Sequence, residues 1–127
     1  MKRIIGIDLG TTNTLCATVF DEGPEVIGDS ENVITPSILS RVKSKWIIVK
    51  EAQKIRTSNP FNTIFSIKRL MGRDISDLED FINELPFKII QADRKLLKIR
   101  IFENDNYIDF TPQELSAEIL KKIKILM

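Results

Sequence analysis

Short apolar segments separated by turn-forming residues characterise the first part of the chain. Residues 4–9, 15–20 and 24–29 are rich in Ile, Val, Leu and Phe, and stretches containing Gly, Asn or Pro lie between them. This pattern predicts a three-stranded meander. The first segment is apolar on both faces, which is typical of a central strand. Residues 36–40 and 46–49 indicate two further short strands.

Helical spacing appears near the middle of the chain. The apolar residues that recur at this spacing are Ile64, Phe65, Ile67, Leu70 and Met71. They predict a helix, and Gly72 supplies its stop. Ser76, followed by Asp77 and Glu79, indicates an N-cap and an acidic first turn. This second helix is expected to be short and to end before Pro86.

The last third of the chain alternates between apolar and polar residues and then becomes helical. Residues 87–92, 95–103 and 107–111 predict a small antiparallel sheet, with a turn at 103–106. The segment Thr111-Pro112-Gln113-Glu114 is a capping box with proline at the first helical position. An apolar stripe follows at Leu115, Ile119, Ile123 and Leu126. The helix has no stop signal, so we expect the chain to be interrupted rather than finished.

Length and composition limit the classes of function. The 127 residues suit one compact domain, and a hydrophobic fraction of 43% supports a core. The 19 basic and 18 acidic residues give a net charge of +1, which offers no electrostatic case for a nucleic-acid or membrane partner. Histidine is absent, and the single Cys16 allows neither a zinc site nor an internal disulfide. Cys16 is expected to be a buried strand residue.

The start of the chain does not resemble a targeting segment. Asp8 interrupts the first apolar run, which stays short of the roughly 7–15 apolar residues of a secretory signal. No run approaches the roughly 18 apolar residues of a membrane span. A cytoplasmic location is therefore expected.

The segment from Asp8 to Asn13 carries the candidate chemistry. Gly10 has no side chain, so backbone N–H groups at this turn can approach a polyphosphate closely. Thr11 and Thr12 add hydroxyl donors, and Asn13 adds an amide donor. Asp8, at the end of the strand, can hold a hydrated magnesium ion beside the phosphates.

The composition of this segment also fits a plain hairpin without a ligand, since such a turn uses Gly, Asn and Thr as well. Two nucleotide-binding motifs do not fit. A Walker loop is excluded because its glycine–lysine–serine/threonine ending is absent, and a dinucleotide fingerprint is excluded because no helix follows the glycine turn.

Several stretches resemble one protein family. Residues 4–14 resemble the first phosphate signature of the DnaK, or heat-shock-seventy, chaperones, within the wider group of actin, sugar kinases and chaperone ATPases. Residues 59–73 resemble a second motif that is specific to the chaperones within that group. Three shorter similar stretches, 35–37, 86–90 and 116–122, follow the same order. The resemblance spans nearly the whole chain.

The resemblance implies an α/β fold, namely part of an actin-like (ribonuclease-H-like) ATPase lobe. Its parts would be an N-terminal β-meander with a hairpin phosphate loop, a small α+β subdomain and a C-terminal helix. Residues 1–37 would begin the phosphate-binding subdomain, and residues 38–111 would form the inserted small subdomain. Residues 112–127 would be a helix that returns to the first subdomain.

The resemblance also implies roles for single residues. Gly10, Thr11, Thr12 and Asn13 would wrap the β- and γ-phosphates of ATP, with Asp8 on the magnesium side, through water. Lys68 would be the catalytic lysine, which reaches the γ-phosphate and the attacking water. Helix periodicity alone instead indicates that Lys68 is a solvated charge on an outer face; the match around it favours the catalytic role.

The function implied is the N-terminal part of an ATP-dependent DnaK-type molecular chaperone that uses ATP or ADP with magnesium. Full-length members act in protein folding and the stress response, with unfolded peptides, a J-domain co-chaperone and a nucleotide-exchange factor as partners. The family's second phosphate loop, further carboxylates and adenosine pocket have no counterpart among the matched stretches. We therefore expect the isolated chain to bind ATP weakly or not at all and not to hydrolyse it.

Two alternatives differ in class. An inactive truncated remnant, or a non-enzymatic association module, would retain the same residues without ATP turnover. A sugar kinase or an actin-like filament protein predicts no match around Lys68 and is disfavoured.

Overall fold

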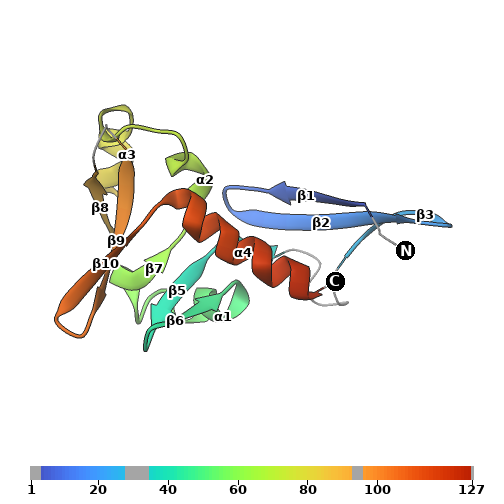
Figure 1. The fold of residues 1–127 in the computed structure, drawn as a ribbon, viewed down its shortest axis with the longest axis horizontal. Helices are drawn as coiled ribbons and strands as arrows, with labels where there is room; N and C mark the ends of the chain where they lie inside the picture. Colours follow the sequence, from blue (N-terminus) through green and yellow to red (C-terminus); the bar gives the residue numbers. More distant parts are fainter. Residues whose placement is uncertain (1–3, 28–34, 93–95, 127) are drawn as a thin grey trace.

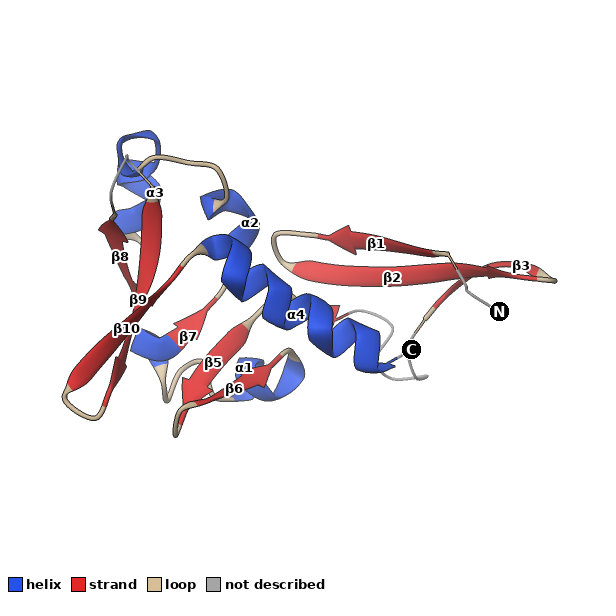
Figure 2. Cartoon of the chain, viewed as in Figure 1, coloured by secondary structure: helices blue, strands red, loops and turns tan. Residues whose placement is uncertain are grey.

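The computed structural model describes residues 4–27, 35–92 and 96–126. Within them the chain is a mixed α/β fold of three small antiparallel sheets and one long C-terminal helix (Figure 1). This confirms the expected fold class. Figure 2 shows that strands predominate and that the other helices are only one or two turns long.

The first sheet contains the N-terminal meander. Its strands are β1 (Ile5–Leu9), β2 (Asn13–Phe20), β3 (Gly23–Val26) and the short β4 (Thr35–Pro36). The meander order β1-β2-β3 is confirmed, while residues 28–29 of the expected third strand lie outside the described residues. The prediction of a central first strand does not hold within the described residues, where β2 is central and β1 pairs with β2 alone.

The second sheet is formed by a hairpin and a two-residue strand. Its strands are β5 (Leu39–Val42), β6 (Lys45–Ile48) and β7 (Thr63–Ile64), in the order β6-β5-β7. Between β6 and β7 lie α1 (Lys50–Lys54) and the 3-10 turn η1 (Pro60–Asn62). The strand expected at residues 36–40 is divided, because Pro36 pairs with β2 whereas β5 pairs with β6.

The helix expected from residue 64 onward is shorter than its spacing indicates. Ile64 belongs to β7, where it is completely buried beside Leu39 of β5. Ser66 has a left-handed backbone with φ 56°, which separates β7 from the helix. Only α2 (Ile67–Leu70) is helical, and Gly72, with φ 69°, supports the predicted stop.

The next helical segment begins two residues earlier than predicted. It consists of the 3-10 turn η2 (Ile75–Leu78) and α3 (Glu79–Asn83). The cap is Asp74, not Ser76, because the Asp74 carboxylate accepts the backbone N–H of Ser76. The Asp77 carboxylate in turn accepts the backbone N–H of Asp74, which completes a capping box.

The third sheet confirms the predicted antiparallel arrangement. Its strands are β8 (Lys88–Gln91), β9 (Leu97–Glu103) and β10 (Asn106–Phe110), in the order β10-β9-β8. Asn104 and Asp105 have positive φ values of 45° and 64°, which the tight turn between β9 and β10 requires. The part of the second expected strand at residue 95 lies outside the described residues.

The C-terminal helix α4 (Pro112–Leu126) begins at the predicted capping box. The Thr111 hydroxyl accepts the backbone N–H of Glu114, and the Glu114 carboxylate accepts that of Thr111. Leu115, Ile119 and Ile123 are buried, which confirms the apolar stripe up to Ile123.

One hydrophobic core holds the sheets and α4 together. Its buried members are Cys16, Leu39, Ile64, Ile67, Leu70, Phe87, Leu97, Ile99, Ile101, Leu115, Ile119 and Ile123. Cys16 is buried as expected, and burial raises the pKa of its thiol. Within the described ranges, no helix has the length and apolar character needed to cross a membrane.

Candidate functional site

The turn between β1 and β2 is closed by its own backbone. The Gly10 N–H donates a hydrogen bond to the Asn13 carbonyl at 3.0 Å, just beyond the last strand pair, Leu9 with Thr14. A Cβ atom at Gly10 would lie closer than 3.0 Å to that carbonyl oxygen, a contact that real Cβ atoms essentially never make. Glycine is therefore required at position 10 by the turn itself, before any ligand is considered.

A second segment fixes the tip of this hairpin. The Ser37 N–H donates to the Thr12 carbonyl at 2.9 Å, and the hydroxyls of Thr14 and Ser37 share a hydrogen bond of 2.7 Å. Thr14 and Ser37 are both buried. Because Asn13 also pairs with Pro36 of β4, the tip is tied to the segment that leads into the second sheet and has a fixed position.

A small pocket of about 220 Å³ lies at the tip. Its lining residues are Thr11, Thr12, Pro36, Ser37, Ile38, Gln53, Arg56, Phe65 and Ser66. They come from the hairpin, the β4–β5 segment, the end of α1 and the segment before α2. The pocket therefore joins Thr11 and Thr12 to the chain that leads into Lys68, as the closeness of α2 to the β1–β2 turn in Figure 1 also indicates.

Lys68 lies on the exposed face of α2. The opposite face of α2 is anchored by the buried Ile67 and Leu70, and α2 packs against α4. The structure thus brings the backbone before Lys68 to the hairpin, while Lys68 itself is not among the residues that line the pocket.

Asp8 is exposed on β1, opposite Leu15 of β2. Among the described residues, none forms a hydrogen bond or an ion pair with the Asp8 carboxylate. The carboxylate is therefore accessible to a ligand. Within the described part of the chain there is also no group of three or more His, Cys, Asp or Glu residues that could hold a metal ion directly. Asp8 as a single carboxylate is chemically suited to holding a hydrated cation through water, as magnesium usually is.

The two asparagines of the second motif have structural roles. The Asn59 amide donates to the Ser40 hydroxyl at 2.8 Å and to the Arg41 carbonyl at 3.2 Å. The Asn62 side chain both donates to the Phe102 carbonyl, at 2.8 Å, and accepts the Phe102 N–H, at 3.0 Å. These bonds tie the chain before Lys68 to β5 and to β9.

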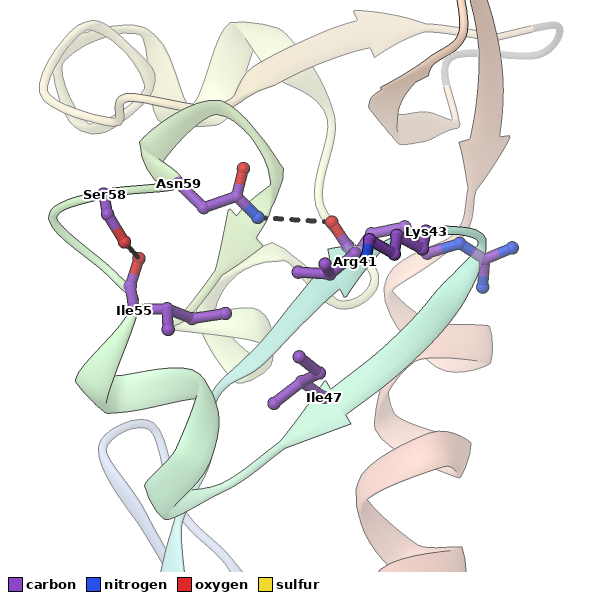
Figure 3. Close-up of a pocket in the computed structure, with 7 residues that line it drawn as sticks. Arg41, Lys43, Ile47, Ile55, Ser58 and Asn59 are labelled. Atoms are coloured by element: carbon purple, nitrogen blue, oxygen red, sulfur yellow. Dashed lines mark hydrogen bonds between the residues drawn. The ribbon is translucent and has the colours of Figure 1, made fainter.

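A larger pocket of about 480 Å³ lies between β5, β6 and the segment after α1 (Figure 3). Its lining residues are Arg41, Val42, Lys43, Ile47, Ile55, Ser58 and Asn59. Figure 3 shows that Asn59 bonds to the Arg41 carbonyl and that Ser58 bonds to Ile55. The Arg41 guanidinium pairs with Glu103 at 2.6 Å. Most polar side chains that line this pocket thus already form hydrogen bonds or ion pairs within the chain.

Sequence reasoning missed Arg56. Its guanidinium lies 3.7 Å from the centre of the Phe65 ring and lines the pocket at the hairpin tip. No spacing signal could have found this residue, because the contact depends on how α1 and the segment before α2 come together in space.

The three small antiparallel sheets and the C-terminal helix are consistent with part of an actin-like ATPase lobe, and the comparison with known families supports this. The family model described as Hsp70 protein matches residues 4–126, nearly the whole chain. The chain belongs to this family. Membership confirms the resemblance in the sequence and assigns the chain to the ATP-binding, heat-shock chaperones.

Proposed function

We propose that the chain is the N-terminal part of the ATP-binding domain of a DnaK-type chaperone and acts in the cytoplasm. Residues 10–13 bind the β- and γ-phosphates, and Asp8 faces magnesium through water. Residues 1–37 and the helix at 112–127 belong to one subdomain, and residues 38–111 form the inserted one. The observation that carries the proposal is the pocket that Thr11 and Thr12 share with Phe65 and Ser66.

The chemistry assigned to these residues is positioning and charge stabilisation. The fixed hairpin tip presents two hydroxyl residues without having to reorganise when phosphate arrives, which favours binding. Magnesium, when bound, would neutralise part of the negative charge of the phosphates. The Lys68 ammonium stabilises the charge that develops as the γ-phosphoryl group leaves. Since Lys68 is exposed, its side chain is free to reach toward a nucleotide held at the hairpin.

A titration with magnesium–ATP, followed by backbone amide NMR, tests the binding roles. The proposal requires weak binding rather than none: the amides of residues 10–13 should shift at millimolar nucleotide, whereas adenosine without phosphates should leave them unchanged. Thr11→Val with Thr12→Val should weaken the ATP response. If these amides do not move at saturating ATP, the nucleotide role of the chain is wrong and the non-enzymatic alternative is favoured.

A turnover assay tests the role of Lys68 separately. The second phosphate loop of the family is not among the matched stretches, so we expect no steady-state ATP hydrolysis by this chain alone. Turnover that disappears in Lys68→Ala would contradict that expectation. In a chain joined to the remaining parts of an ATPase domain of this family, Lys68→Ala should abolish hydrolysis and retain ATP binding.

The association alternative is favoured by one observation. Several large apolar side chains of the first sheet are exposed, including Ile7 at 46% and Val19 at 72%, and so is Ile4, just before β1, at 90%. Among the described strands β1 pairs with β2 alone, and exposed apolar residues on such a sheet favour contact with further polypeptide. Concentration-dependent sedimentation without any ATP response would support association over nucleotide binding.

A further inference from the structure

The pocket at the hairpin tip contains one charged side chain, that of Arg56. The other polar side chains that line it are those of Thr11, Thr12, Ser37, Gln53 and Ser66, and none is a carboxylate. A pocket with a guanidinium, several hydroxyls and no acidic group suits an anion. Its volume of about 220 Å³ is below the roughly 300–1,000 Å³ of pockets that enclose a whole small ligand, so it fits one group of a larger ligand.

Arg56 differs from the two arginines of the sheets. Arg41 pairs with Glu103 at 2.6 Å, and Arg100 pairs with Asp109 at 2.9 Å. In contrast, no carboxylate among the described residues forms an ion pair with Arg56. The Arg56 guanidinium therefore has the capacity to bind an anion from solution.

Stacking on Phe65 holds Arg56 in place. The guanidinium lies 3.7 Å from the ring centre, and Phe65 is itself fixed by an edge-on contact with the buried Phe87, at 5.3 Å between centroids. A stacked guanidinium keeps its N–H groups free at its edge, where they can form two hydrogen bonds with a phosphate. The stack thus limits the motion of Arg56 without using its donors.

We propose that Arg56 is a further phosphate-binding residue, which contacts a phosphate group seated at the Thr11–Thr12 tip. The inference rests on the function proposed above for the hairpin, and it adds a residue from the second subdomain to that site. Phosphate held between Arg56 and the hairpin would link the end of α1 to the first sheet. The shared ligand chemistry is a phosphate group, either of a nucleotide or of inorganic phosphate.

The direct test observes the Arg56 side chain. Its Nε–H signal, assigned by comparison with Arg56→Lys, is followed by NMR while magnesium–ATP or inorganic phosphate is added to the full chain. We expect the signal to move with magnesium–ATP, and movement with phosphate alone would show that the phosphate group suffices. Movement of the residue 10–13 amides with ATP while the Arg56 signal stays fixed would overturn the role of Arg56 and leave the hairpin proposal intact.

A variant series measures the contribution to affinity. Arg56→Gln should weaken magnesium–ATP binding by about threefold or more, because it removes a charge-assisted contact at a solvent-accessible site. Arg56→Lys, which keeps the charge but loses the planar fork, should fall between wild type and Arg56→Gln. The matched control, Arg73→Gln, removes the same charge from an exposed residue outside this pocket and should retain wild-type affinity.

The outcomes separate the two proposals. Equal affinities for wild type, Arg56→Gln and Arg56→Lys overturn the Arg56 assignment alone. Equal weakening by Arg56→Gln and Arg73→Gln also overturns it, because net charge would then explain the loss. If wild type shows no response to any phosphate compound, both proposals are wrong. A selective loss in Arg56→Gln that added salt diminishes supports the assignment.

Discussion

The backbone N–H of Gly10 and the carbonyl oxygen of Asn13 form the hydrogen bond that closes the β1–β2 turn, at 3.0 Å. The same oxygen occupies the space that a side chain at position 10 would need. Stability and the proposed phosphate binding therefore both favour glycine at this position. A substitution at Gly10 tests the contribution to stability.

Gly10→Ala should destabilise the chain by about 1–3 kcal/mol, because the methyl group meets backbone rather than a flexible side chain. Urea unfolding measures this change. The control is Gly6→Ala in the preceding strand β1, where the nearest atom to an added Cβ is the Ala17 carbonyl oxygen, at an ordinary 3.9 Å. If the two variants lose equal stability, the turn geometry is not the reason for glycine at position 10.

The Arg41–Glu103 pair connects the second and third sheets. Both side chains are only 15% exposed, and the guanidinium also lies over the rings of Trp46 and Phe110, at 4.9 and 5.6 Å. Glu103→Gln should cost about 1–3 kcal/mol, since it leaves a largely buried guanidinium without its anion. Unfolding in urea gives the value. Lys121→Ala, in the exposed pair with Glu118, should cost about 0.5 kcal/mol or less.

A double-mutant cycle isolates the pairwise energy of Arg41 with Glu103. Arg41→Met and Glu103→Gln should be strongly non-additive, because each single change removes the same interaction. Additive losses would instead indicate that Arg41 stabilises the chain through its two aromatic contacts alone.

A buried polar cluster holds the chaperone-type motif against β5. The hydroxyls of Ser40 and Thr63, both fully buried, share a hydrogen bond of 2.8 Å, and the Asn59 amide donates to Ser40. Ser40→Ala should cost about 1–3 kcal/mol, because it removes a partner of two polar groups in the interior. Thermal unfolding checks this. The exposed Ser58→Ala should stay within about 0.5 kcal/mol of wild type, and a similar loss in both variants would refute the argument.

The sequence correctly predicted those elements whose hydrogen bonds join residues only a few positions apart. The capping box from Thr111 to Glu114 is satisfied by residues three apart, so its hydrogen bonds follow from the sequence itself. The glycine turn at residue 10 and the β9–β10 hairpin are of the same kind. In each case the chemistry of a few adjacent residues leaves the backbone few alternatives.

Sequence reasoning failed where distant partners decide the structure. Ile64 has helical spacing with Ile67, yet it forms β7 because pairing with Leu39 buries it completely. The contact of Arg56 with Phe65 likewise arises only in the folded chain. The hairpin side of the pocket could thus be predicted from the sequence. The opposite side, which includes Arg56 and Phe65, could not. The cap of η2 is a local exception, because Asp74 accepts the N–H of Ser76, only two residues further along the chain.

The ion pair of Arg100 with Asp109 predicts how stability responds to acid. The two side chains face each other across β9 and β10, with contacts of 2.9 and 3.1 Å. The hydrogen bonds from Arg100 hold the pKa of Asp109 below its ordinary value. A carboxyl whose pKa is lower in the folded state than in the unfolded state stabilises the fold when ionised.

The sign of the effect defines the pH window. The contribution of Asp109 is fully present above the unfolded pKa of about 3.9, and it is lost as pH falls from there through the lowered folded value. Asp109→Asn should therefore be less stable than wild type at pH 7, and the difference should shrink below about pH 4. Arg100→Gln should behave in the same way, since it removes the donor that lowers the pKa. Urea midpoints measured from pH 7 down to acid provide the comparison, and a gap that stays constant across that range would show that the pair contributes no pH-dependent stability.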